Sequence, residues 1–168
     1  MPDMIRRYVR AVDAVNAAIG RFAMLLIFAL MGILLWSSIS KAFFVPANWT
    51  LEMAQFTMVA YYILGGPWSL QAGEHVRMDL LYGALSDRAK AWMDSFTVLF
   101  LIAYLALLFY GGLSSTAYAL KYGERSYSSW APYMAPIKIV ACIGIFLMLL
   151  QAFALLFKDV AKLRGEEL

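Results

Sequence analysis

The 168-residue sequence contains a single cysteine and a single histidine, and both shortages limit its chemistry. Because Cys142 has no second cysteine to pair with, an intrachain disulfide, a CxxC redox pair and a cysteine-based zinc site are excluded. Because His75 stands alone, a haem held by two histidines of this chain is excluded too. Charge is also scarce: 15% of residues are charged and 63% are hydrophobic, against roughly 25% and 45–50% in soluble domains. This composition excludes an ordinary soluble domain.

Four stretches contain no charged residue at all: 22–40, 53–73, 95–120 and 139–157. A helix rises about 1.5 Å per residue and the hydrocarbon core of a bilayer is about 30 Å thick, so each stretch can cross the membrane once. We therefore predict an all-α integral membrane protein. Its transmembrane helices are expected at residues 22–40, 53–72, 95–118 and 139–157. The first is expected to be retained, because it is longer than a signal-peptide core and no small-residue cleavage site follows it.

The distribution of lysine and arginine predicts the orientation in the membrane. Ten of these residues fall in the segments 1–21, 73–94 and 158–168, and four fall on the other side of the spans. The positive-inside rule then places both termini in the cytoplasm, and Trp49 and Trp130 in the outer loops suit the interfacial belt of aromatic residues. Because membrane topology explains the basic residues, we do not expect the chain to bind nucleic acid.

Two polar segments have apolar residues at helical spacing. Residues 1–21 predict a basic amphipathic helix along the cytoplasmic surface, where arginine gains from anionic phospholipids; the alternative is that this helix simply extends the first span into water. Residues 73–94 predict a second amphipathic helix that lies flat at the same surface. The outer segment 119–138 is rich in turn-forming residues and is too short to form a domain of its own.

The spans offer little chemistry. No carboxylate, histidine or arginine lies at mid-depth, which argues against ion-coupled transport by this chain alone. The run Gly65-Gly66-Pro67 predicts a kink; broken helices mark binding sites in many transporters, but a packing kink is favoured here. Two pairs of small residues four apart in the third span, at 111 and 115 and at 112 and 116, would let another helix approach closely.

Beyond the second span, four ionisable residues lie close together: Glu74, His75, Arg77 and Asp79. An acid–base role for the glutamate and histidine is one interpretation, but no nucleophile or metal partner accompanies them. A structural turn at the cytoplasmic interface is favoured, with the histidine facing the aspartate one helical turn later.

This cluster also carries a resemblance. The run QAGEHVRMDLL at 71–81, the Leu64-Gly65 pair before it, Trp49 with Glu52 at the outer end of the span, and the outer-loop run GERS at 123–126 resemble the small membrane subunit of tripartite ATP-independent periplasmic (TRAP) transporters. The resemblance covers most of the chain from residue 36 onward. Members often have two adjacent acidic residues at the start of span 2, whereas here Met53 follows Glu52.

The resemblance implies a non-catalytic subunit, without a cofactor of its own, in a sodium-coupled uptake system for organic acids in the bacterial inner membrane. Its partners would be a large membrane subunit, which carries sodium and substrate, and a periplasmic solute-binding protein; the small subunit would act as a scaffold for the first and help to dock the second. An oligomeric four-helix channel or carrier and the membrane anchor of a redox enzyme are the alternatives. The residues expected at partner or membrane interfaces are Trp49, Glu52, Glu74, His75, Arg77, Asp79, Glu124, Arg125 and Trp130.

Overall fold

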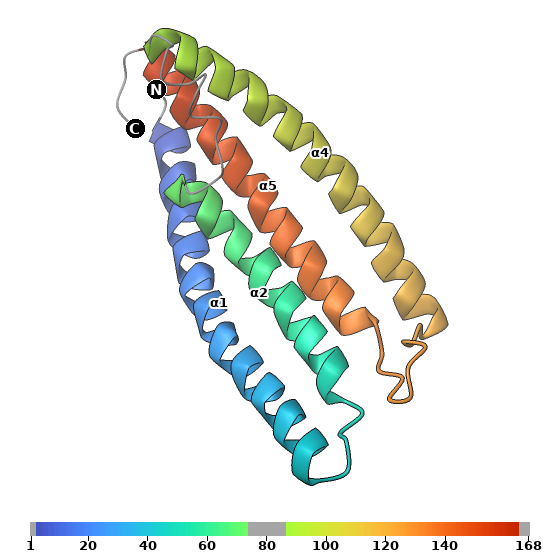
Figure 1. Cartoon of the computed structure of the whole chain (residues 1–168). Coiled ribbons are helices and arrows are strands. Elements are labelled where there is room, and N and C mark those ends of the chain that lie inside the picture. The colour runs from blue at the N-terminus through green and yellow to red at the C-terminus, as the bar shows by residue number, and fades with distance from the viewer. Residues whose placement is uncertain (1–2, 74–86, 165–168) are drawn as a thin grey trace.

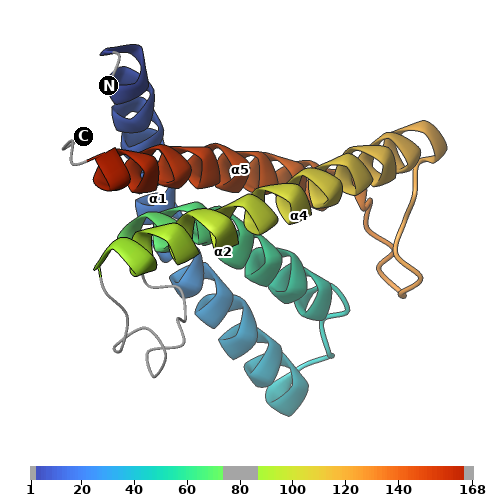
Figure 2. The same ribbon diagram turned by 90° about the horizontal axis from the view of Figure 1, so that it is seen from above.

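The computed structural model describes residues 3–73 and 87–164, and these form a bundle of helices that run alongside one another (Figure 1). The described helices are α1 (Asp3–Phe43), α2 (Thr50–Ala72), α4 (Asp87–Tyr122) and α5 (Ala135–Arg164). Within the described residues the only β-type pairing is an isolated bridge in the loop between α4 and α5. The start of α1 and the end of α5 lie at the same end of the bundle (Figures 1 and 2). The all-α fold class predicted from the sequence is thus observed.

Helix α1 joins two segments that the sequence analysis separated. The predicted boundary between residues 1–21 and 22–40 is absent, because one helix of 41 residues runs from Asp3 to Phe43. No proline interrupts this stretch, and a helix does not have to end where its apolar part begins. Val9 and Val12, on the apolar face of the basic segment, are buried with Ala154 of α5. Part of that apolar face therefore packs inside the bundle.

Three of the described helices are long and apolar enough to cross a membrane: α1, the segment Trp92–Tyr122 of α4 and the segment Ala135–Ala161 of α5. Helix α2 is long enough at 23 residues, but Glu52, two glutamines and the Gly-Gly-Pro run lower its hydropathy. Its crossing, the four-span count and the cytoplasmic termini stay predictions. Helix α2 continues through Pro67, which is buried, and it ends at Gly73, whose φ of 73° favours glycine.

Helix α5 is the centre of the bundle, because it contacts α1, α2 and α4. Its Ile145 and Ala152 form one buried cluster with Leu70 of α2 and Leu105 of α4. Of the two small-residue pairs in the third predicted span, Gly112 with Thr116 packs against Cys142 of α5, at 3.2 Å from its sulfur to the threonine hydroxyl. One of the two predicted close approaches is thus made within the chain.

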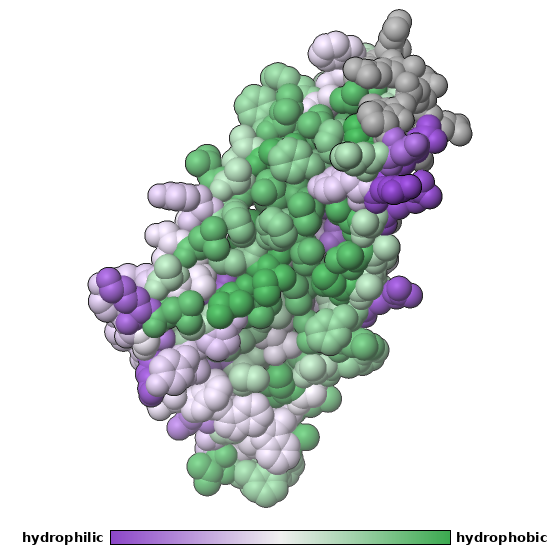
Figure 3. All heavy atoms as spheres, turned by 180° about the vertical axis from the view of Figure 1, so that it is seen from behind, coloured by the Kyte–Doolittle hydropathy of each residue, from purple (hydrophilic) through white to green (hydrophobic). Residues whose placement is uncertain are grey.

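The outer helices leave much of their apolar surface exposed. Only 11% of the most apolar part of α1 and of α4 is buried, against 39% for α5. Large side chains such as Phe28 on α1 and Leu107 on α4 are more than two-thirds exposed. Seen from behind, hydrophobic residues cover the middle of the molecule and hydrophilic residues gather towards its edges (Figure 3). This is the pattern of a surface that contacts lipid or another apolar protein.

The close approach of α2 and α5 depends on Gly144. A Cβ atom at this glycine would lie 2.1 Å from Ile63 Cγ2 and 2.9 Å from the Ile63 carbonyl oxygen, which belongs to the backbone and cannot move aside alone. We therefore expect Gly144→Ala to lower the free energy of unfolding by about 1–3 kcal/mol, the usual cost of overpacking. The measurement is thermal unfolding of the purified chain in mild detergent, followed by circular dichroism.

Gly32→Ala is the matched control, because a Cβ atom at Gly32 meets nothing within 4 Å among the described residues. Alanine favours a helix over glycine by up to about 1 kcal/mol, so this variant should unfold at the same or a higher temperature. Equal destabilisation by the two variants would show that the α2–α5 approach is not what Gly144 provides.

Candidate partner interface

At the end of the bundle where α2 begins, a buried carboxyl group ties α2 to the loop between α4 and α5. Glu52 lies in the first turn of α2 and is only 7% exposed. Its Oε1 accepts a hydrogen bond of 2.6 Å from the Ser126 hydroxyl. Its Oε2 is buried and has no hydrogen-bond partner among the described residues. A buried acceptor without a partner is costly, so the bond from Ser126 matters for holding the loop against the helix.

The loop itself is a short hairpin. The Ser126 N–H donates to the Pro132 carbonyl and the Met134 N–H donates to the Glu124 carbonyl, both at 3.0 Å. These two bonds form an antiparallel β-bridge between Arg125 and Tyr133. The Arg125 guanidinium lies 4.1 Å from the centre of the Tyr133 ring and donates to its hydroxyl. Residues 123–134 are therefore ordered by their own contacts, beyond what their turn-forming composition predicts.

An ion pair fixes the base of the hairpin, where Lys138 Nζ lies 2.5 Å from Glu124 Oε2. Both side chains are partly exposed, so the pair contributes little free energy by itself, but it joins the hairpin to the first turn of α5. We call Glu52, Glu124, Arg125, Ser126, Tyr133 and Lys138 the hairpin cluster. It brings together three of the residues predicted from the sequence, and Ser126, Tyr133 and Lys138 complete it.

The remaining predicted residues divide into two groups. Trp49, just before α2, is 38% exposed, and Trp130, at the hairpin, is 41% exposed, so both indoles are available at the surface of this end. The predicted cluster Glu74, His75, Arg77 and Asp79 lies outside the described residues, and its interfacial role stays a prediction.

A second polar cluster lies towards the opposite end of the bundle. The Asn16 amide donates to Gln151 Oε1 at 2.6 Å, and the Gln151 amide donates to Asp13 Oδ1 at 2.9 Å. Lys158 Nζ donates to Asp13 Oδ2 at 2.7 Å. Gln151 is completely buried and Asn16 is 1% exposed. We call these four residues the α1–α5 network, because they join α1 to α5 through side chains alone.

This network was not among the predicted sites, although the sequence contains a signal for it. Asp13 lies four residues after Val9, and Asn16 lies four residues after Val12, so all four share the helix face that was recognised only by its apolar members. An asparagine on an apolar helix face within reach of a glutamine in another span is a candidate interhelical pair.

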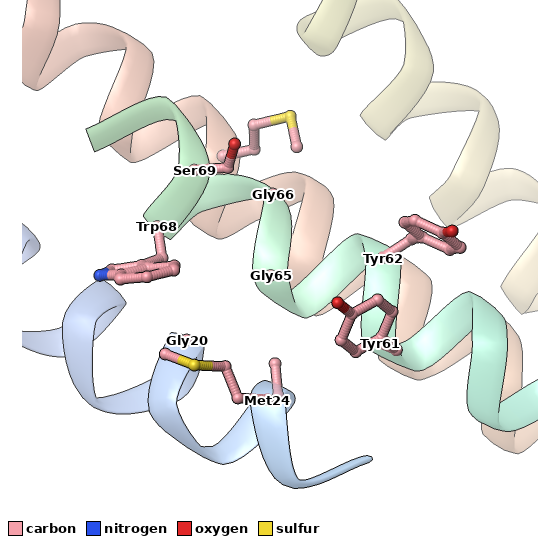
Figure 4. A pocket seen from close by; sticks show the side chains of 10 residues that line it. Gly20, Met24, Tyr61, Tyr62, Gly65, Gly66, Trp68 and Ser69 are labelled. Atoms are coloured by element: carbon pink, nitrogen blue, oxygen red, sulfur yellow. The ribbon is translucent and has the colours of Figure 1, made fainter. Parts of the chain in front are cut away.

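The structure also contains an apolar cavity of about 330 Å³ between α1 and α2 (Figure 4). The side chains of Tyr61, Tyr62, Trp68 and Met24 surround it, and the glycines at 20, 65 and 66 leave room beside them. Trp68 packs so closely on α1 that a Cβ atom at Gly20 would lie 2.5 Å from the Trp68 Cβ atom. No ionisable carboxyl or amine lines the cavity, so its chemistry suits apolar contacts rather than an ion site.

Removing the Ser126 hydroxyl tests the hairpin cluster. We expect Ser126→Ala to leave both oxygens of Glu52 without a partner, at a cost of about 1–3 kcal/mol to the closed loop. The hairpin should then open more often, and trypsin should cleave after Arg125 about tenfold faster or more. Ser129→Ala, an exposed serine in the same hairpin, is the control and should be cleaved at the wild-type rate. Identical rates for all three proteins would mean that Ser126 does not hold the loop.

The α1–α5 network predicts a strongly non-additive pair of substitutions. Gln151→Leu leaves the buried Asn16 amide and one oxygen of Asp13 without a hydrogen-bond partner. It should therefore lower the free energy of unfolding by about 1–3 kcal/mol. Asn16→Leu combined with Gln151→Leu removes both partners and should cost less than the sum of the single changes. The measurement is thermal unfolding in detergent of Gln151→Leu, of Asn16→Leu and of the double variant. Gln55→Leu, at an exposed glutamine of α2, is the matched control and should have little effect.

One known protein family matches the part of the chain that contains most of these features. The family described as tripartite ATP-independent periplasmic transporters, DctQ component, matches residues 30–162. The match includes the hairpin cluster, the cavity residues of α2, and Gln151 and Lys158 of the network, whereas Asp13 and Asn16 precede it. Comparison with curated proteins and with solved structures yields no match. The matched region covers most of the chain, and the chain belongs to the DctQ components, the small membrane components of TRAP transporters.

Proposed function

We propose that the chain is the fixed scaffold of its transporter, a non-catalytic subunit that holds the large sodium- and substrate-carrying membrane subunit at a constant depth in the bacterial inner membrane. The observation that carries this proposal is the uneven burial of the helices. Helix α5 contacts the three other described helices and is the most buried of the three apolar helices, while α1 and α4 expose large apolar side chains along most of their length. Such faces can serve as contact surfaces for a second membrane protein without any rearrangement of the bundle.

A scaffold must also resist deformation, and polar contacts link the helices near both ends. The hairpin cluster joins α2 to the α4–α5 loop at one end, and the α1–α5 network joins the outer helix α1 to the central helix towards the other. Between them the spans contain no charged residue, so they offer no carboxylate to compensate the charge of a sodium ion inside the membrane. This supports placing the transport chemistry, and the uptake of organic acids, on the large partner subunit.

The hairpin is the surface we propose for docking the solute-binding protein. Its Tyr127 side chain is fully exposed, and Trp130 is partly exposed beside it. The contacts of Arg125 and Glu124 hold the hairpin in one conformation, so less entropy is lost when a partner binds. This proposal places the hairpin end in the periplasm and both termini in the cytoplasm.

The test is to purify a C-terminally tagged chain from its native host in mild detergent, identify stoichiometric partners by mass spectrometry, and measure how the purified complex binds the solute-binding protein. We expect recovery of a much larger multispanning protein. Trp130→Ala should weaken binding of the solute-binding protein about tenfold, as for an aromatic residue at the centre of an interface, without lowering recovery of the large subunit. Trp92→Ala, at an exposed tryptophan at the start of α4, is the matched control and should bind normally.

Two results would overturn the proposal. Recovery of this chain alone, as a defined oligomer that moves solute in vesicles, would favour an independent channel or carrier and direct attention to the cavity beside Gly65 and Gly66. Unchanged binding in Trp130→Ala, with normal assembly, would remove the docking role of the hairpin and leave the scaffold role to be judged by recovery of the large subunit.

A further inference from the structure

A polar pocket of about 430 Å³ lies between the first turns of α1 and the last turns of α5. It is lined by Arg6, Val9, Arg10, Asp13 and Lys158. Three of these side chains are cationic and one is acidic, so the formal charge of the lining is 3 − 1 = +2. Neither the scaffold role nor the docking role uses this charge.

The charges of Asp13 and Lys158 are already matched within the protein. Asp13 Oδ2 accepts a hydrogen bond of 2.7 Å from Lys158 Nζ, and Asp13 Oδ1 accepts one of 2.9 Å from the Gln151 amide. Both carboxylate oxygens therefore have a partner. The excess positive charge therefore belongs to Arg6 and Arg10. These two residues are one helical turn apart and project from the same face of α1.

The two arginines have donors to spare. Arg6 Nε is buried and has no hydrogen-bond partner among the described residues. Arg10 uses its Nε to donate to the Arg6 carbonyl at 3.4 Å, which leaves the other nitrogens of its guanidinium for a ligand. Two guanidinium groups with a planar arrangement of donors suit the oxygens of a phosphate group, which they can bind in bidentate fashion.

The depth of the pocket indicates where the phosphate comes from. Lys158 is the first charged residue after the uncharged stretch 139–157 of α5, so the pocket lies where the apolar part of the bundle ends. Phospholipid headgroups occupy this level of a bilayer, and basic pockets between transmembrane helices bind anionic headgroups. The side chain of Val9 gives the pocket an apolar wall as well, which suits a lipid better than a free ion.

We infer that this pocket binds the phosphodiester group of an anionic phospholipid, such as phosphatidylglycerol, through Arg6 and Arg10. The bound headgroup lies beside the α1–α5 network and fixes the depth of α1 at the membrane surface. Because either leaflet supplies headgroups at this boundary, the inference is independent of the predicted orientation. It is also independent of the proposed scaffold role, since lipid binding is measured without a partner subunit.

The experiment titrates dioctanoyl phosphatidylglycerol into the purified full chain in detergent and counts bound lipids by native mass spectrometry. Parallel titrations use dioctanoyl phosphatidylcholine, which carries no net charge, and inorganic phosphate. We expect one tightly retained phosphatidylglycerol, at least tenfold weaker retention of phosphatidylcholine, and no comparable binding of inorganic phosphate. The double variant Arg6→Gln with Arg10→Gln should lose affinity for phosphatidylglycerol by about five-fold per arginine.

The matched control is Arg7→Gln with Arg21→Gln, which removes the same charge from exposed arginines of α1 that do not line the pocket. Arg21 donates its Nε to the carbonyl four residues earlier, as Arg10 does, so it reproduces the local geometry as well. The control pair should retain wild-type affinity. If the Arg6 and Arg10 double variant does not fold, Arg10→Gln alone, at an exposed position, should still weaken binding about five-fold.

Several outcomes would overturn the inference. Equal loss of binding in the control pair would mean that the whole basic face of α1 attracts lipid without a site. Binding of inorganic phosphate as tight as that of phosphatidylglycerol would make the pocket a small-anion site. Equal retention of phosphatidylcholine, or unchanged binding after substitution of Arg10, would remove the role assigned to the arginines.

Discussion

The rest of the structure depends on how closely α2 approaches α5. Lipid tails are as apolar as the side chains of the spans, so the hydrophobic effect contributes little to the association of membrane helices. Close packing must therefore stabilise their association. Gly144 of α5 provides this packing, because its missing side chain leaves room for Ile63 of α2. Helix α1 then packs on α2 where Trp68 lies over Gly20, and α4 packs on α5 where Gly112 lies against Cys142. Each outer helix is thus held by a small residue at its contact.

Polar contacts complement this packing near the two ends of the bundle. An amide without a hydrogen-bond partner in apolar surroundings is costly. The hydrogen bond between Asn16 and Gln151 therefore favours the placement of α1 on α5 in which the two side chains meet. The bond between Ser126 and Glu52 acts in the same way for the hairpin. Because these groups are directional, they specify how the helices are placed relative to one another, which apolar packing does less well.

The sequence predicted the all-α class and the resemblance to the DctQ components, and three of its four expected spans coincide with helices apolar enough to cross a membrane, because each of these depends on long composition patterns or ordered motifs. It also singled out Glu52, Glu124 and Arg125, which the structure brings to one hairpin cluster. It did not predict their partners, since the bond from Ser126 to Glu52 joins residues 74 positions apart. The helix end expected at residue 21 is absent for a similar reason, and the continuous helix agrees with the alternative in which residues 1–21 extend the first span. A change in polarity along α1 marks a change in surroundings, not the end of a helix.

Helix α2 shows how far composition alone can support a membrane span. Its sequence contains a glutamate, two glutamines and a buried proline, and it has no membrane-length segment as apolar as those of α1, α4 and α5. Two of these residues are nevertheless accommodated by contacts within the protein. Glu52 lies in the first turn and bonds to the hairpin, and Pro67 is enclosed in the bundle rather than exposed to lipid. A helix of this kind gains stability in a bilayer only when its neighbours cover it, because its own transfer from water is weakly favourable. If α2 crosses the membrane as predicted, its contacts with α1 and α5 supply part of this cover.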